Sequence, residues 1–477
     1  MSENVLLMSP PYHTGIIEIT GNWTPTNLVY LAGHLRAVGH TVEIYDAMTK
    51  NHTIDEVGLQ VSSKHPDIVM IGAYTSSVNC ALDVLRLVKK DNPHIITCLG
   101  GVHATFCYDE ILTESNGFVD FIIRGEGERT AVELTHALEA GNDLTEISGL
   151  AFYREGKVVK TPDRDFADNL DELIPAWDLL EWEDYFFKLT DRRLAVVSSS
   201  RGCNHKCKFC SQHLFWKGTY RERTPENFVT EIEYLHNTFG VGMFMLADEY
   251  TTKNRDRWER ILDLLIEKEM DVQFSLETRV DDILRDEDII QKYRLAGVIH
   301  VYVGVESVNQ KTLDDYGKQL QVKQSKKALA ILNNAEIITE CSFIMGGPDE
   351  TADSMEMTLQ SAIEFNPDLA HFLFITPWPY ADIYKELEPY ITEKDYSKYH
   401  FVYPVVKPKS MGINEVWEKL IDCFRVFYMD KAKQYQNAPE GIKKQYMLKA
   451  IQIMHKEFFT TNFGNSLIKP PKGVHHR

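Results

Sequence analysis

Short apolar runs alternate with stretches of helical periodicity over the first 140 residues. The apolar runs resemble buried parallel strands and cover residues 5–8, 41–46, 67–72, 95–101 and 120–128. Residues 28–38 and 81–90, between these runs, have apolar positions at helical spacing. Repeated strand–helix units with short loops predict a doubly wound, Rossmann-like α/β domain over residues 1–140. Ligands of such a sheet bind at the carboxyl ends of its strands.

A second α/β pattern occupies residues 191–384. Strands are expected at residues 194–197, 243–247, 272–276, 300–305 and 340–345, and helices at residues 225–239, 255–269 and 322–335. Repeated βα units predict a second parallel sheet, curled into a partial (β/α) barrel. We expect residues 141–190 to form a connector with a small hairpin near residues 153–158, and residues 385–477 to form a helical C-terminal extension.

Composition narrows the class of protein. The 477 residues are 44% hydrophobic and 25% charged, as in ordinary globular proteins. The net charge of -19 argues against nucleic acid as a partner, because phosphate binding normally needs a basic face. The sequence has neither a long apolar run nor a signal-peptide pattern, so we expect no integral membrane segment. Eight cysteines, three of them clustered, suit a reducing cytoplasm better than a disulfide framework.

The three clustered cysteines are the strongest chemical signal in the chain. Cys203, Cys207 and Cys210 follow an expected strand with the spacing C-x3-C-x2-C. Three thiolates on one loop can hold three irons of a [4Fe-4S] cube and leave the fourth iron open. The alternatives are a zinc site completed by His205 or His213, and a redox pair with a third cysteine nearby.

This loop resembles that of the radical S-adenosylmethionine (SAM) enzymes. The resemblance implies that SAM chelates the open iron and is cleaved to a 5′-deoxyadenosyl radical. Downstream strand ends fit the same pattern in order, although acidic residues replace glycines at the first of them. The residues implied in SAM binding are Asp248, Glu249, Glu277, Arg279, Gly304, Glu306 and Phe209. Taken alone, each signal is weak, and Glu306 by itself is more typical of a structural ion pair.

The N-terminal sheet resembles the cobalamin-binding domain of the cobalamin-dependent radical SAM class. Small and hydroxyl residues on the rim suit a flat corrin, and the residues implied are Ser76, Gly100, Gly101, His103, Thr105 and Glu126. The D-x-H-x-x-G motif of other cobalamin proteins is absent, so cobalamin without an axial histidine is expected. His103 is either a ligand or a hydrogen-bonded loop histidine. The alternative for the whole domain is a sheet that binds nothing, and no G-x-G-x-x-G fingerprint indicates a dinucleotide.

Further segments resemble the anaerobic magnesium-protoporphyrin IX monomethyl ester oxidative cyclases of bacteriochlorophyll synthesis. They include residues 21–23, 45–49, 101–106, 246–249, 376–379 and 427–429. The resemblance implies oxidative closure of a fifth ring on a tetrapyrrole, with oxygen from water and a flavodoxin- or ferredoxin-type electron donor. It identifies no catalytic residue. Trp23, Phe215, Trp216, Trp378 and Tyr380 either stack on a macrocycle or fill a core between domains. The alternatives are a methyltransferase of the same class and a binding or regulatory protein that kept the cofactor domains.

Overall fold

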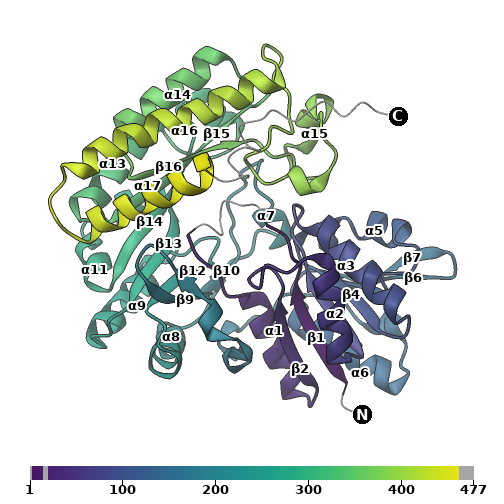
Figure 1. Cartoon of the computed structure of the whole chain (residues 1–477). Helices are drawn as coiled ribbons and strands as arrows, with labels where there is room; N and C mark the ends of the chain where they lie inside the picture. Colours follow the sequence, from purple (N-terminus) through teal and green to yellow (C-terminus); the bar gives the residue numbers. More distant parts are fainter. Residues whose placement is uncertain (1–2, 14–19, 461–477) are drawn as a thin grey trace.

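The computed structural model describes residues 3–13 and 20–460. Two sheets with their helices lie beside each other, and two long C-terminal helices cross the second sheet (Figure 1). The expected fold class, a doubly wound domain followed by a partial barrel and a helical C-terminus, is confirmed. No helix within the described residues is long and apolar enough to cross a membrane.

The first sheet has the strand order β2-β1-β3-β4-β5-β6-β7, and its first five strands are parallel. These are β1 (Asn4–Ser9), β2 (Thr41–Asp46), β3 (Ile68–Gly72), β4 (Ile96–Gly100) and β5 (Phe121–Ile123). Apolar cores fill both faces. The covering helices are α1 (Thr26–Ala37), α2 (Ile54–Lys64), α3 (Val78–Asp91), α4 (Val102–Phe106), α5 (Tyr108–Glu114) and α6 (Gly127–Ala140). The strand order reverses between β1 and β3, where doubly wound sheets bind ligands.

The expected connector contributes to both sheets. Its hairpin, β6 (Leu150–Arg154) and β7 (Lys157–Lys160), pairs antiparallel to β5 and extends the first sheet. A short strand, β8 (Phe186–Phe187), pairs with the first strand of the second sheet. The division of the chain at residues 140, 190 and 384 stays a prediction.

The second sheet has the order β16-β15-β14-β13-β12-β9-β8, and its six strands from β9 to β16 are parallel. They are β9 (Arg192–Val197), β12 (Met243–Leu246), β13 (Gln273–Arg279), β14 (Val298–Glu306), β15 (Ile338–Met345) and β16 (Leu369–Phe374). The outer helices are α8 (Pro225–Phe239), α9 (Arg255–Glu267), α10 (Val280–Arg285), α11 (Ile290–Leu295), α12 (Gln310–Asp315), α13 (Val322–Asn334) and α14 (Ala352–Phe365). Because β9 and β16 do not pair, the barrel is open.

The C-terminal segment is helical only in part. After α15 (Tyr384–Leu387), the chain up to residue 412 consists of turns and short 3-10 segments, and the long helices are α16 (Ile413–Gln436) and α17 (Ile442–Thr460). Tyr446 and Met447 of α17 pack with Leu194, Met243 and Ile338 of the barrel strands. This helix therefore covers the barrel from inside, on the face opposite the outer helices.

Candidate active site

The cysteine loop starts at β10 (Ser200–Arg201), which pairs with β11 (Arg221–Glu222), and ends at the short helix α7 (Gln212–Phe215). Gly202 has φ +100°, and an added Cβ would fall on the Thr219 carbonyl oxygen, so the residue before the first cysteine must be glycine. The loop is also tied to distant segments. The Lys208 N–H donates to the Tyr316 carbonyl at 2.9 Å, and the Lys208 carbonyl accepts from the Ile383 N–H at 3.0 Å.

All three thiols are free and close enough to interact electrostatically. Burial raises the pKa of each, that of Cys210 to about 12, whereas the Lys318 ammonium and then the Arg279 guanidinium oppose the rise at Cys207. A bound cation favours the thiolate at such a site. Within residues 3–13 and 20–460, no three His, Cys, Asp or Glu side chains converge on one metal ion. A [4Fe-4S] cube takes one thiolate per iron, so its ligands need not converge, and the loop fits this group.

Two acidic residues after β12 hold this loop rather than project from it. The buried Asp248 carboxylate accepts from the Ser199 N–H at 2.7 Å and from the hydroxyls of Ser199 and Ser200. Glu249 accepts from the Gly202 N–H at 3.0 Å and from the Trp216 indole at 2.8 Å. Both residues therefore position the strand and the glycine that precede Cys203.

Arg279 and Glu306 are also occupied by protein partners. Arg279 donates to Asp281 at 2.9 Å and to the Lys318 carbonyl at 3.1 Å. Glu306 accepts from Lys318 Nζ at 2.8 Å and from the Ser342 hydroxyl at 3.0 Å. A Cβ at Gly304 would lie 2.7 Å from both partners of the Glu306–Lys318 ion pair. Gly304 therefore has a structural reason to be glycine, in addition to the nucleoside contact that the sequence resemblance implied.

Glu277 differs from these residues because its side chain is open to solvent and the structure gives it no hydrogen bond. Desolvation by the surrounding protein, followed by repulsion from Glu340, raises its pKa to about 7. On neighbouring strands, Glu340 lies between His371 and His300, with His300 Nε2 at 2.7 Å. Although burial opposes it, these two histidines hold the pKa of Glu340 well below its usual range. Glu277 is the accessible carboxyl group of the barrel interior.

The rim of the first sheet is built around glycines. Gly101 has φ +94°, and a Cβ there would lie 2.5 Å from the Ala73 carbonyl oxygen of the neighbouring strand end. The Thr105 hydroxyl donates to the Gly101 carbonyl at 2.8 Å and accepts from the Gly125 N–H at 3.0 Å. Gly100 and the half-buried Ser76 lie on the same rim. Nothing lies within 4 Å of a Cβ built at Gly125, so the rim leaves open space for a flat ligand.

His103 is buried, and its Nδ1 lies 3.0 Å from the Thr75 hydroxyl. The Thr75 hydroxyl is in turn 2.8 Å from that of Tyr380, and the Tyr396 ring packs edge-on against His103. Burial lowers the pKa of His103 to about 4, so the ring is neutral near pH 7. This geometry favours the hydrogen-bonded loop histidine over the ligand.

Glu126, which the sequence resemblance assigned to cobalamin, joins an ion-pair network between the first domain and the β10–β11 strand pair. Its carboxylate accepts from Arg201 at 2.8 Å, from Arg221 at 2.9 Å and from the Ala167 N–H at 3.0 Å. Arg201, which immediately precedes the cysteine loop, also pairs with Glu128 at 2.7 Å. Glu126 therefore fastens the first domain to the two-stranded β10–β11 sheet from which the cysteine loop extends.

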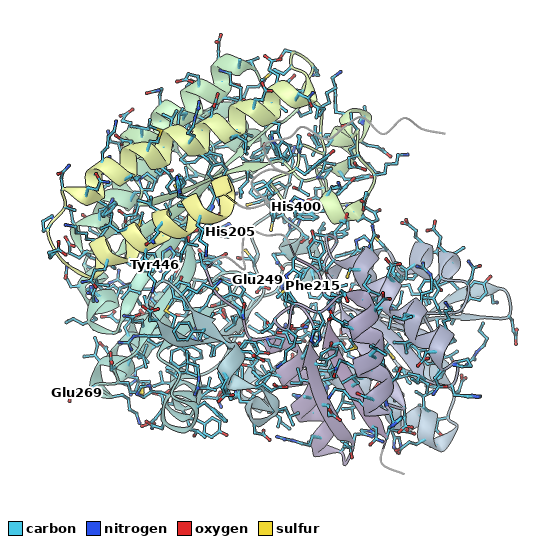
Figure 2. The ribbon with its side chains drawn as sticks, viewed as in Figure 1. His205, Phe215, Glu249, Glu269, His400 and Tyr446 are labelled. Carbon is cyan, nitrogen blue, oxygen red and sulfur yellow. The ribbon has the colours of Figure 1, made fainter. Side chains whose placement is uncertain are left out.

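The aromatic candidates are divided between core packing and the site. Tyr380 stacks on Phe106 with 4.7 Å between ring centroids, and Phe209 packs edge-on against Tyr316 at 5.3 Å. Trp216 is buried beneath Glu249, while Phe215 is half-buried. In Figure 2, Glu249 and Phe215 lie where the barrel faces the first sheet.

Sequence analysis expected ligands at the strand end that carries Tyr74 but assigned this residue no role. It follows β3 beside the reversal in strand order, and 73% of it is exposed. Nevertheless, desolvation and then the Glu249 carboxylate raise its pKa. This combination is typical of a side chain in a protein-walled space, and it places Tyr74 close enough to Glu249 for an electrostatic interaction. The sequence signal that could have identified Tyr74 is its position at the carboxyl end of β3.

Comparison with known proteins identifies the chain's relatives. Residues 197–362 match the Radical SAM superfamily, and residues 12–135 match the B12 binding domain. An anaerobic magnesium-protoporphyrin IX monomethyl ester cyclase from Rubrivivax gelatinosus is 38% identical over 465 residues, covering 96% of this chain and 83% of that protein. The chain belongs to the cobalamin-dependent radical SAM enzymes. Its cofactors are a [4Fe-4S] cluster, SAM and cobalamin, and the zinc and redox-pair alternatives are excluded.

Other members of this enzyme class are also related. A protein from Pyrococcus horikoshii named as an uncharacterized methyltransferase is 30% identical over 429 residues, covering 89% of this chain and 92% of that protein. The solved structure of the radical SAM methyltransferase TsrM from Kitasatospora setae aligns with a TM-score of 0.67 over 82% of this chain and 75% of that one. At 16% identity the TsrM match shows a shared fold alone. The prediction of a radical SAM oxidoreductase is confirmed, and the reaction is a separate question.

Proposed function

We propose that this enzyme closes the fifth ring of (bacterio)chlorophyll without molecular oxygen. The substrate is magnesium-protoporphyrin IX 13-monomethyl ester, the keto oxygen comes from water, and the product is divinyl protochlorophyllide. The observation that carries the proposal is the 38% identity to the Rubrivivax gelatinosus cyclase over 96% of the chain. A flavodoxin- or ferredoxin-type protein supplies the electron that starts each turnover.

In this proposal Cys203, Cys207 and Cys210 hold the cluster, and the bound cofactors supply hydrogen abstraction and electron transfer. The protein binds and orients the cofactors and the substrate, and it excludes competing reactions. Glu277 is the group we assign to the SAM hydroxyls, because it is accessible and has no protein partner. Asp248, Glu249, Arg279 and Glu306 are positioning residues, since other protein groups already occupy their polar atoms.

We assign the cobalamin face to the rim of the first sheet. Ser76, Gly100, Gly101 and Thr105 line it, and Tyr74 extends it toward Glu249. His103 and Glu126 support the rim from behind, through Thr75 and through Arg201.

Mass spectrometry of an anaerobic reaction tests the proposal. Reconstituted holoenzyme, SAM, a reductant and the magnesium porphyrin ester are incubated in water enriched in oxygen-18. A product with one heavy oxygen and a new ring supports the cyclase. A product heavier by one methylene supports the second candidate, a methyltransferase, which the Pyrococcus horikoshii relative favours. Absence of porphyrin turnover, with SAM binding intact, contradicts both activities on this substrate.

A further inference from the structure

A cavity of about 150 Å³ lies where the first sheet meets the barrel, and the proposed function assigns nothing to it. Described residues that follow β1 and β2 line it, and it is partly open. Its described lining residues are His13, Gly21, Asn22, Trp23, Met48, Thr49 and Asn51.

One wall of the cavity is fastened to the barrel. Gly21 forms a β-bridge with Phe187, and the Asn22 N–H donates to the Phe186 carbonyl at 3.3 Å. The Asn22 side-chain amide donates to the Asp184 carbonyl at 2.9 Å. These contacts hold Trp23 in place without using its indole N–H.

Two polar atoms of this lining are buried without a hydrogen bond, Trp23 Nε1 and Thr49 Oγ1. An indole N–H can only donate, and a buried donor without an acceptor is costly. The Thr49 hydroxyl lies near the Asp46 carboxylate without hydrogen-bond geometry. The cavity wall therefore contains one group that can only donate, the Trp23 indole N–H, and one hydroxyl, that of Thr49, that can also donate to an acceptor oxygen.

The charges around the cavity favour a neutral ligand. Its described lining contains no lysine or arginine. Asp46, close to Thr49, is buried and accepts from the Tyr185 hydroxyl at 3.2 Å. A carboxylate ligand would be repelled by this acidic side chain, with His13 as the one described lining residue that can carry a positive charge, whereas an ester or amide carbonyl would meet no such repulsion.

The volume limits the ligand to a small group. A cavity of roughly this size holds one benzene molecule, which matches the six heavy atoms of methyl propionate and is far too small for a macrocycle. The cavity also shares a wall with the barrel interior. The Trp23 ring lies 6.0 Å from that of Phe187, which lies 6.1 Å from that of Tyr446. The Tyr446 hydroxyl, on the barrel side in Figure 2, is 3.1 Å from His300 Nδ1.

We propose that this cavity receives a short, neutral side arm of the substrate that ends in an ester carbonyl, with Trp23 Nε1 and the Thr49 hydroxyl as its donors. The proposal rests on the proposed function only for the identity of the arm, which would be the methyl-esterified propionate. The existence of an ester-binding cavity does not depend on the reaction.

Indole N–H resonances of the anaerobic holoenzyme, labelled with nitrogen-15 tryptophan, test the proposal. Methyl propionate and sodium propionate are titrated separately as probes. We expect methyl propionate to shift the Trp23 resonance saturably, propionate to bind more weakly, and the other six indole resonances to stay in place. A Trp23 resonance that does not respond to methyl propionate, or that responds more strongly to propionate, overturns the proposal.

Matched variants separate the donors from general packing effects. Trp23→Phe keeps an aromatic ring, although a smaller one, and removes the N–H; in ligand-detected NMR it should weaken methyl propionate binding about fivefold, as expected for one lost hydrogen bond. Thr49→Val should also weaken it. Thr190→Val removes another buried hydroxyl without a partner, outside the cavity lining, and should leave binding unchanged. Equal binding by Trp23→Phe and wild type overturns the proposal. Ester binding without porphyrin turnover contradicts only the proposed function.

Discussion

At the scale of single residues, Gly202 decides whether the cysteine loop can form. Gly202→Ala combines an unfavourable positive φ with a clash against the Thr219 carbonyl, and the two effects should cost about 3 kcal/mol. We expect the purified variant to contain much less iron and acid-labile sulfide per chain than wild type.

Gly218→Ala is the matched control for this prediction. Gly218 also has positive φ, +67°, but nothing lies within 4 Å of an added Cβ. It should cost about 1 kcal/mol and keep full iron content. Equal iron loss in both variants would show that backbone strain, rather than the close approach to Thr219, determines the loop.

Glu277 should make stability depend on pH. Its pKa is raised from 4.5 to about 7 in the folded protein, so ionising it destabilises the folded state. This penalty is absent below pH 4.5, grows as the pH rises to 7 and stays constant above that. Glu277→Gln should therefore raise the free energy of unfolding above pH 7, by about 1 kcal/mol after allowing for solvent exposure.

Urea unfolding between pH 4.5 and 8 measures this effect, with Glu269→Gln as the control on the outer surface (Figure 2). The control should follow wild type at every pH. A Glu277→Gln curve parallel to wild type would mean that Glu277 is solvated like a surface carboxylate.

Residue type and spacing sufficed to predict a [4Fe-4S] cofactor, because three thiolates within eight residues serve few other purposes; the assignment of the three cysteines as its ligands stays a prediction. Residue type and spacing could not indicate which protein groups the carboxylates contact. Asp248 and Glu126 stand at strand ends, as site residues do, but their partners Ser199 and Arg201 are brought to them by the tertiary structure. Tyr74 was assigned no role for the same reason, since its neighbour Glu249 belongs to the other sheet.

At the scale of elements, sequence prediction succeeded where local signals were complete. Helix α8 matches its expected bounds because the Thr224 hydroxyl caps it, proline follows at Pro225, and Gly240 adopts the left-handed conformation at its end. Strand β16 was missed because inward-facing His371 interrupts its short apolar run. The hairpin β6–β7 was expected, but its pairing with β5 is a long-range contact that local patterns do not encode.

The end of β9 and the start of the cysteine loop depend on one buried carboxylate. Asp248→Asn keeps the shape but replaces one acceptor oxygen with a donor, which then faces a hydroxyl or N–H of Ser199 or Ser200. We expect a loss of about 3 kcal/mol in unfolding free energy and faster amide exchange at residues 199–203. Ser200→Ala, which removes a single hydrogen bond, should cost about 1 kcal/mol. Equal costs would show that Asp248 is not the anchor of this segment.

At the scale of the whole molecule, the first domain is joined to segments that flank the barrel on both sides of the site. The Glu126–Arg201–Arg221 network fastens one side, and the Thr75–Tyr380 hydrogen bond with the Phe106–Tyr380 stack fastens the other. The Glu126 network connects the rim of the first sheet to the strand before the cysteine loop. The Tyr380 contacts connect the same rim to the segment that follows β16. We therefore expect these contacts to set the spacing between the proposed cobalamin face and the cysteine loop.

Glu126→Gln distinguishes this structural role from cobalamin binding. The side chain of Glu126 is only 8% exposed and accepts from two arginines, so the neutral amide should leave buried positive charge uncompensated and cost about 3 kcal/mol. Glu133→Gln, at the half-exposed Arg164 ion pair, should cost below about 1 kcal/mol. Urea unfolding measures both costs, and equilibrium titration measures cobalamin affinity. Glu126→Gln should keep this affinity within about twofold of wild type, because no polar atom of Glu126 remains free to contact the corrin. A large loss of cobalamin affinity at unchanged stability would instead return Glu126 to the corrin site that the sequence implied.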